Sequence, residues 1–186
     1  HSNPTGITTA AAKKAGALKL LRRYEKAAGH PIYLLEDAAY RELRFAGEDT
    51  PSALTMDRDS NRVIYTSTYS KPFATGVRIG YGLLPEPLLT AALRVKGNHD
   101  FGTTNLLQQL ITRALTSGAY EKHVQTLRKR YGRKASAMVA AIQRHIPEGV
   151  KWIQPAGGLY VWVRMPTRVK TDLNSKLFKA ALRQKM

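Results

Sequence analysis

Short, largely apolar runs mark the first half of the 186-residue chain, at Ile32–Leu35, Val63–Tyr65 and Val77–Leu84. Runs of this kind are typical of strands buried on both faces. Helical or loop segments separate them, rather than two-residue turns. This pattern predicts an α/β fold built on a mostly parallel sheet with helices on its faces. Because the link from Tyr65 to Val77 is short for a helical crossover, an antiparallel edge strand is a second option.

Helical periodicity fills most of the remaining sequence. A first helix is expected over Thr9–Ala28, ending at Gly29. The residues expected to face inward on it are Leu18, Leu21 and Ala28. Two more helices are expected over Glu86–Lys96 and Asn105–Ser117.

The last third of the chain predicts one long helix followed by a smaller α+β unit. Apolar residues recur three, four and seven positions apart, which indicates an amphipathic helix that ends before Pro147. They are Tyr120, Val124, Leu127, Tyr131, Met138 and Ile142. Val150–Ile153 and Leu159–Val163 then bracket a Pro-Ala-Gly-Gly turn, as the strands of a small pair would. A closing helix is expected over Asp172–Lys185.

The composition narrows the class of protein. The longest uninterrupted apolar run, Ala137–Ile142, is far shorter than the roughly 20 residues that cross a bilayer. The absence of cysteine excludes disulfides and thiolate sites, and the five histidines show no metal-ligand spacing. We therefore expect a cytoplasmic protein without a metal site.

A formal net charge of +17 raises nucleic acid as a partner. The densest basic cluster is Arg128-Lys129-Arg130 followed by Arg133-Lys134. No basic surface with interleaved aromatic residues and no DNA-binding helix pair accompanies it, so we interpret the cluster as a solvated helix face. A basic nucleic-acid-binding module stays an alternative that rests on charge alone.

Four short motifs carry the candidate chemistry, and each lies in the opening loop or near the end of a predicted strand. They are Asn3-Pro4-Thr5-Gly6, Asp37-Ala38-Ala39-Tyr40, Thr68-Tyr69-Ser70-Lys71 and Arg78-Ile79-Gly80. Each is weak by itself, because a lysine after serine is most often a surface residue and Asn-Pro-Thr-Gly is most often a turn. The evidence for a functional site comes from the four motifs occurring together in this order along the chain. In open α/β sheets, ligand-binding groups gather at the strand ends.

This set resembles the fold-type I pyridoxal 5'-phosphate (PLP) enzymes, in the branch of the aspartate, aromatic and 2-aminoadipate aminotransferases. The resemblance implies that Lys71 holds the cofactor aldehyde as a Schiff base and shuttles the substrate proton. It implies that Asp37 lies beside the pyridine nitrogen and that Tyr40 and Asn3 donate to the ring oxygen. The cofactor phosphate would be held by Thr68, Ser70 and Arg78. The family's Ser-Phe-Ser-Lys is Thr-Tyr-Ser-Lys here, which keeps both hydroxyls.

The resemblance also implies an organisation and a reaction. Residues 1–119 would be the C-terminal part of the PLP-binding large domain, 120–146 a long linking helix, and 147–186 the truncated start of a small α+β domain. The segment Pro155–Pro166 resembles the small-domain signature. We expect an internal fragment of a homodimeric aminotransferase that exchanges an amino group between an α-amino acid and a 2-oxo acid.

Two alternatives share these residues. Related PLP chemistry, such as β-elimination or aminocyclopropane-carboxylate synthesis, would use the same groups. The effector-sensing domain of a GntR-type transcription regulator has the same fold and often keeps the lysine. A winged-helix segment preceding His1 would decide for the regulator.

Overall fold

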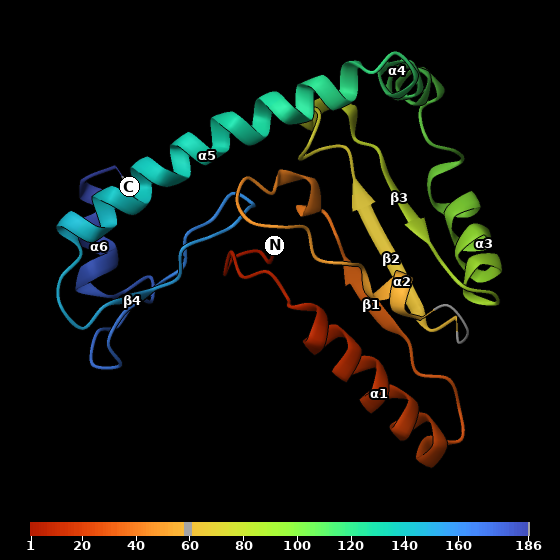
Figure 1. Ribbon diagram of the computed structural model, residues 1–186, viewed down its shortest axis with the longest axis horizontal. Coiled ribbons are helices and arrows are strands. Elements are labelled where there is room, and N and C mark those ends of the chain that lie inside the picture. The colour runs from red at the N-terminus through yellow and green to blue at the C-terminus, as the bar shows by residue number, and fades with distance from the viewer. Residues whose placement is uncertain (58–60, 186) are drawn as a thin grey trace.

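The structure is a computed structural model that describes residues 1–57 and 61–185. Its elements are, in chain order, α1 (Ala11–Ala28), β1 (Leu34–Asp37), η1 (Arg41–Leu43), α2 (Ala53–Met56), β2 (Val63–Thr68), η2 (Thr75–Val77), β3 (Gly80–Leu83), α3 (Leu88–Asp100), α4 (Asn105–Thr116), α5 (Ala119–His145), β4 (Lys151–Trp152), β5 (Val163–Arg164) and α6 (Lys176–Arg183). The sheet β1-β2-β3 and α1 lie toward one end of α5, and β4, β5 and α6 lie toward its other end (Figure 1). The predicted mixture of sheet and helices is therefore confirmed.

The three-stranded sheet has the order β1-β2-β3. Strands β1 and β2 are parallel, with Leu34 opposite Val63 and Asp37 opposite Thr66. Strands β2 and β3 are antiparallel. The parallel pairing and the option of an antiparallel strand after the short link are both found.

Strand β3 is shorter than the Val77–Leu84 run predicts. Thr75–Val77 forms a turn of 3₁₀ helix, and Arg78 has a left-handed backbone with φ 49° and ψ 32°. Since a strand needs an extended backbone, pairing begins only at Gly80. The apolar run is thus divided between a turn and a strand.

The strands are not buried on both faces, contrary to the sequence prediction. Leu18 of α1 and Ala53 of α2 pack with Val63 and the partly buried Leu34 on one face of the sheet. Successive strand residues point to opposite faces, and Leu35 is 61% exposed on the other face. All four residues of β3 are exposed as well.

Helix α1 ends as the sequence predicts. Gly29 takes the left-handed conformation with φ 71°, and its N–H donates to the carbonyl of Glu25. Leu18 is buried, but Ala28 is exposed, contrary to the expectation. Ala28 comes ten residues after Leu18. At 3.6 residues per turn, its side chain is therefore rotated by nearly a right angle about the helix axis and lies off the buried face.

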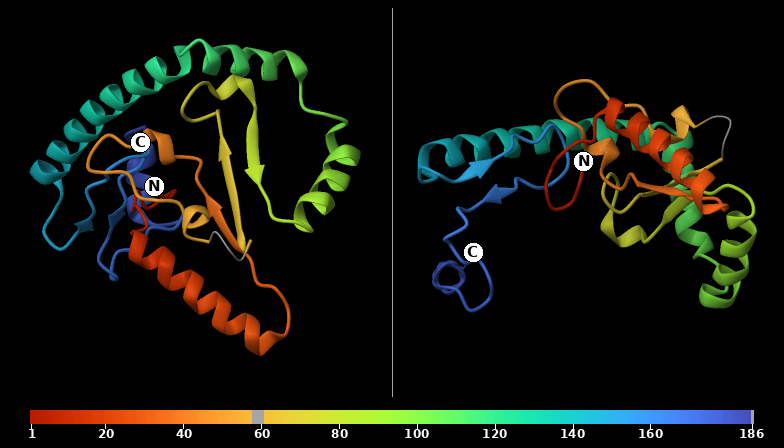
Figure 2. Two further views of the ribbon diagram at one scale, coloured as in Figure 1. Left: turned by 45° about the vertical axis from the view of Figure 1, so that its right-hand side comes forward. Right: turned by 90° about the horizontal axis from the view of Figure 1, so that it is seen from below.

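Helix α5 forms over 27 residues as one continuous element. Tyr120, Val124 and Ile142 of its predicted stripe are buried, whereas Met138 is 54% exposed and Val139 is buried instead. Val139 lines the same hollow as the segment Gln154–Pro155, which lies beside this part of the helix. The right-hand view of Figure 2 shows the chain turning back at the C-terminal end of α5, with α6 lying away from that helix.

The small strand pair forms as predicted but with shorter strands, and Trp152 of β4 lies opposite Val163 of β5. The segment after η1 attaches the turn between these strands to the rest of the chain. The N–H of Phe45 donates to Ala156 O at 3.0 Å, and the N–H of Gly158 donates to Leu43 O at 3.0 Å. The final helix is confined to Lys176–Arg183.

Within the described residues, none of the helices combines the length and apolar character that crossing a membrane requires.

Candidate functional site

The end of strand β1 presents two acids to opposite faces of the sheet. Glu36 faces α1 and α2, where it accepts hydrogen bonds from Lys14 Nζ at 2.6 Å and from the hydroxyl of Ser52. Asp37 faces the other way and is exposed, and its Oδ1 accepts the N–H of Ala39 at 3.0 Å. Asp37 is therefore the acid that remains open to a ligand.

Glu36 has a structural role that the sequence analysis did not assign. Burial opposes its charge, but the hydrogen bonds from Lys14 and Ser52 outweigh burial and lower the pKa of its carboxyl. Its side chain is 14% exposed. An acid one residue before Asp37 was visible in the sequence, yet only the folded α1 and α2 reveal its partners.

Tyr40 links the opening loop to the lysine motif. The side-chain amide of Asn3 donates to the Tyr40 hydroxyl at 3.3 Å. Lys71 Nζ lies 5.8 Å from the centroid of the Tyr40 ring, within the range of a cation–π contact. Tyr160 packs edge-on against the same ring at 5.9 Å. Burial raises the pKa of Tyr40, so that its hydroxyl keeps its proton and can donate.

The turn after β2 assembles hydroxyls with a guanidinium. The N–H of Ser70 donates to Thr68 Oγ1 at 3.1 Å, which fixes the chain just before Lys71. Arg78 Nη1 lies 3.4 Å from Ser70 Oγ and donates to Thr75 O at 3.2 Å. The left-handed backbone of Arg78, uncommon for a residue with a side chain, points its guanidinium back toward this turn.

Helix α5 supports the same turn through a residue that the sequence analysis missed. His123 Nε2 lies 3.0 Å from the carbonyl oxygen of Phe73, two residues after Lys71. The two rings pack edge-on at 5.5 Å. Fifty positions separate the partners, so no local pattern signals the contact.

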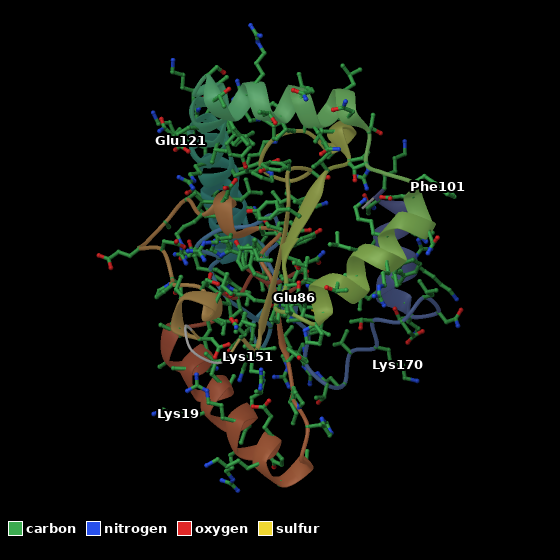
Figure 3. All side chains as sticks on the ribbon, turned by 90° about the vertical axis from the view of Figure 1, so that its right-hand side faces the viewer. Lys19, Glu86, Phe101, Glu121, Lys151 and Lys170 are labelled. Carbon is green, nitrogen blue, oxygen red and sulfur yellow. The ribbon has the colours of Figure 1, made fainter. Side chains whose placement is uncertain are left out.

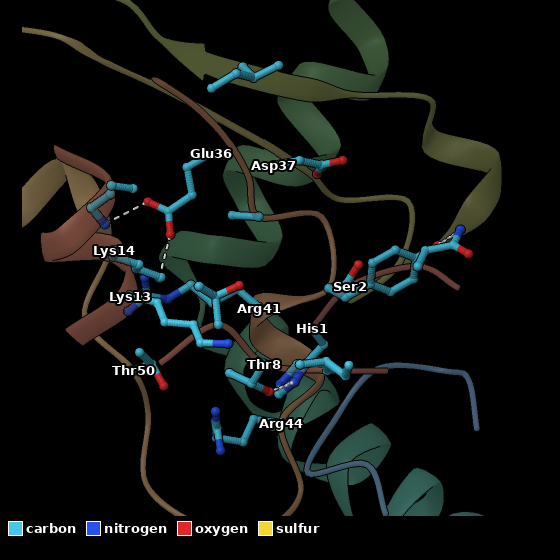
Figure 4. A pocket seen from close by; sticks show the side chains of 18 of the residues that line it. His1, Ser2, Thr8, Lys13, Lys14, Glu36, Asp37, Arg41, Arg44 and Thr50 are labelled. Atoms are coloured by element: carbon cyan, nitrogen blue, oxygen red, sulfur yellow. Dashed lines mark hydrogen bonds and ion pairs between the residues drawn. The ribbon is translucent and has the colours of Figure 1, made fainter. Parts of the chain in front are cut away.

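A hollow of about 360 Å³ adjoins part of this set. Asn3, Asp37 and Tyr40 line it together with basic residues of α1 and η1. Figure 4 shows Lys13, Lys14 and Arg41 on one side of the hollow and Asp37 toward its opposite edge. The residues of the lysine turn do not line it; these are Thr68, Ser70, Lys71 and Arg78.

The predicted set thus forms two groups that meet at Tyr40. One group is Asn3 with Asp37 at the mouth of the hollow, and the other is the turn that carries Lys71. Asp37 and Lys71 do not contact each other. In the part of the chain that the structure describes, no three acids or histidines lie in a group able to hold a metal ion.

Comparisons with known proteins agree on one family. The family model described as aminotransferase class I and II matches residues 1–185. The chain is 33% identical over 172 residues to aromatic-amino-acid aminotransferase 1 of Thermococcus litoralis, covering 92% of this chain and 39% of that protein. It is 28% identical over 171 residues to an uncharacterised HTH-type transcriptional regulator, YdfD of Bacillus subtilis, covering 92% of this chain and 34% of that protein.

A solved structure shows the same arrangement of elements. The kynurenine aminotransferase of Pyrococcus horikoshii, in complex with PMP, matches with a TM-score of 0.88 and 31% identity. That match covers 98% of this chain and 43% of the other, so the chain spans less than half the length of the proteins it resembles. With the family model matched along nearly its whole length, the chain belongs to the aminotransferase class I and II family.

Proposed function

We propose that the protein containing this chain is a PLP-dependent aminotransferase that moves an amino group between an α-amino acid and a 2-oxo acid. One observation carries the proposal: Lys71 follows strand β2 with its ammonium over the ring of Tyr40, in the turn formed with Ser70 and Arg78. Membership of the aminotransferase class I and II family supports it, since the family implies PLP. The complex of the P. horikoshii enzyme with PMP is a further support.

The residues present fit this cofactor. A phosphate group needs hydroxyls and a fork-shaped cation, and Thr68, Ser70 and Arg78 supply these within one turn. A protonated pyridine nitrogen needs an anion, and Asp37 is an exposed carboxylate at a strand end. An aldehyde needs a primary amine, which Lys71 offers without an ion pair among the described residues.

Each residue then has a defined task. When bound, PLP supplies a conjugated ring that takes up the electron pair left on the substrate Cα after proton loss. Lys71 would hold the cofactor covalently through Nζ and, once displaced by the substrate amine, move the Cα proton. Tyr40 and Asn3 would donate hydrogen bonds to the ring oxygen, since both carry a polar hydrogen at neutral pH.

Amino transfer by the full-length protein tests the proposal. We would supply PLP, 2-oxoglutarate and a panel of aromatic, acidic and 2-aminoadipate donors, and measure glutamate by chromatography. Wild type should form glutamate, Lys71→Ala should form none, and Lys19→Ala, on the outer face of α1, should match wild type (Figure 3). Turnover by Lys71→Ala at the wild-type rate would overturn the proposal.

A second candidate function is effector sensing in a transcription regulator. The 28% identity to the regulator YdfD favours it, because that match also covers 92% of this chain. Wild-type protein that binds PLP yet transfers no amino group from any donor would support this candidate over the enzyme.

We also propose that the full-length protein is a homodimer. Large exposed apolar side chains on α3, on α4 and in the link between them support further protein contact: Val95 is 68%, Phe101 91% and Leu106 76% exposed. Figure 3 shows Phe101 projecting away from the rest of the chain. Light scattering should give twice the mass of one chain, and a monomer at micromolar concentration would contradict the proposal.

A further inference from the structure

A second hollow lies between the 41–49 segment and helix α5, and it shares Arg41, Arg44 and Asp49 with the hollow beside Asp37. Its volume is about 970 Å³, and Gln154 and Pro155 are among the residues that line it. Among the described residues that line it, five are basic and two are acidic: Arg41, Arg44, Arg128, Lys129 and Arg133 against Glu42 and Asp49. We call it the basic groove.

Both acids of the basic groove already have partners. Asp49 Oδ2 lies 2.6 Å from Arg41 Nη2 in an ion pair. Glu42 accepts the hydroxyl hydrogen of Tyr120 at the start of α5. Asp49 also lies 4.0 Å from Arg44, so two acids face five basic residues and most of the positive charge of the groove is poorly compensated.

Arg44 shows most clearly that the groove lacks hydrogen-bond acceptors and negative charge. Its side chain is only 13% exposed, and its Nε is buried without a hydrogen-bond partner within the described structure. The nearest acid atom, Asp49 Oδ1, is 4.0 Å from that nitrogen, beyond hydrogen-bond distance. Nη1 donates to Ala46 O at 2.9 Å. A buried donor left without an acceptor is costly, and an anion would supply the acceptor.

Helix α5 adds two more cations to the opposite wall. Lys129 and Arg133 are four residues apart, so they lie on the same side of the helix. Both are exposed, and neither has an ion pair among the residues that the structure describes. Like charges at this spacing repel, and a shared anion reverses the effect.

We propose that the basic groove binds a phosphoryl group carried by a small molecule. A phosphoryl dianion suits the fork of Arg133 and the point charge of Lys129 together, because it offers several acceptor oxygens. Phe45 and Val139 form an apolar part of the wall, beside which an organic group could lie. Arg78 and Lys71 of the proposed cofactor site do not line it.

Calorimetric titration of the full-length protein loaded with PLP, which occupies the proposed cofactor phosphate site, tests the basic groove. Phenyl phosphate and inorganic phosphate are used as separate probes. We expect one saturable site per chain that weakens as salt rises from about 50 to 200 mM. Arg133→Ala should weaken binding at least about tenfold, since a charge-assisted contact is lost. Arg130→Ala removes the same charge from α5 outside the groove and should leave affinity unchanged.

The outcomes separate the source of the anion from the existence of the site. If phenyl phosphate binds more tightly than inorganic phosphate, the ligand of the groove is a phosphate ester. If the two bind equally, the ligand is free phosphate. Either result supports a phosphoryl site in the groove. Absence of saturable binding would overturn the proposal. Equal weakening by Arg130→Ala and Arg133→Ala would overturn it as well. So would a clear preference for duplex DNA over both small probes.

Discussion

Tyr40 is the residue on which the two groups of the candidate site meet. It is 9% exposed, accepts a hydrogen bond from Asn3 and lies beneath the ammonium of Lys71. Its hydroxyl is protonated at neutral pH, and burial, which raises its pKa further, keeps it a hydrogen-bond donor. Because the ring contacts Lys71 and the hydroxyl contacts Asn3, the two parts of the side chain can be tested separately.

Tyr40→Phe keeps the ring beneath Lys71 and removes the hydroxyl. We expect kcat for amino transfer to fall by about tenfold, which corresponds to one hydrogen bond of about 1.4 kcal/mol. Steady-state kinetics measure the loss, with Tyr24→Phe on the exposed face of α1 as a control. An unchanged kcat in Tyr40→Phe would show that the hydroxyl does not act on the reaction.

Glu36 gives a prediction about pH. Its carboxyl pKa lies below the ordinary value of 4.5 because bonds from Lys14 and Ser52 outweigh burial. A lowered folded-state pKa stabilises the fold above the unfolded pKa, and this contribution is lost as pH falls through the folded-state value. Glu36→Gln should therefore lower the free energy of unfolding at pH 7 by about 1–2 kcal/mol.

The difference between Glu36→Gln and wild type should shrink as the pH drops below 4.5. Urea denaturation at neutral and acidic pH measures it. Glu48→Gln, on the exposed part of the 41–49 segment, is the control and should show no such difference. If the difference in the free energy of unfolding between Glu36→Gln and wild type did not change with pH, the stabilising role of the Glu36 carboxylate would be contradicted.

At the scale of elements, η1 and the segment after it connect three parts of the molecule. Leu43 of η1 is fully buried, and Arg128 of α5 donates to the carbonyl of Glu42 at 2.7 Å. The same segment hydrogen-bonds Ala156 and Gly158 of the small pair. A short turn thus holds the strand end, the long helix and the small pair together.

Leu43→Ala should be among the more damaging substitutions in this region. Truncating a fully buried leucine costs about 2–5 kcal/mol, through lost burial and a residual cavity. Leu20→Ala, at a position 53% exposed on α1, should cost less than about 1 kcal/mol. Chemical denaturation of both variants measures the contrast, and equal costs would mean that η1 does not form this junction.

The sequence predicted the helices well because their signals are local. The stripe on α5 and the glycine that ends α1 depend on residues a few positions apart. Strand burial was predicted wrongly, since an apolar run at Leu35 does not say which neighbours cover it. The turn of η1 was missed because its contacts to Ala156 and Arg128 join segments far apart in the chain.

In the candidate site too, local motifs could be found in the sequence and long-range contacts could not. The resemblance carried by the motifs implied a shared site, and the structure places Asn3 and Lys71 each in contact with Tyr40, while the roles of these residues stay a prediction. It could not predict His123 beneath the lysine turn, since the contact spans fifty positions. The basic groove was equally hidden, because its walls come from separate elements.

For the whole molecule, the charge of +17 is the feature least explained by the proposed enzyme. If the charge is a solvated surface with one groove for small anions, the full-length protein should bind duplex DNA only non-specifically. At about 150 mM salt a fluorescence titration should give a Kd no tighter than roughly 10⁻⁶ M. Nanomolar binding would instead favour the nucleic-acid-binding alternative.

Covalent labelling of Lys71 tests the central claim most directly. Full-length protein would be incubated with PLP, reduced with borohydride, digested and analysed by mass spectrometry. The account predicts a pyridoxyl group on Lys71, in the peptide that contains Thr68-Tyr69-Ser70, and no label in Lys71→Ala. A label at another lysine, or amino transfer by wild type without a label at Lys71, would contradict it.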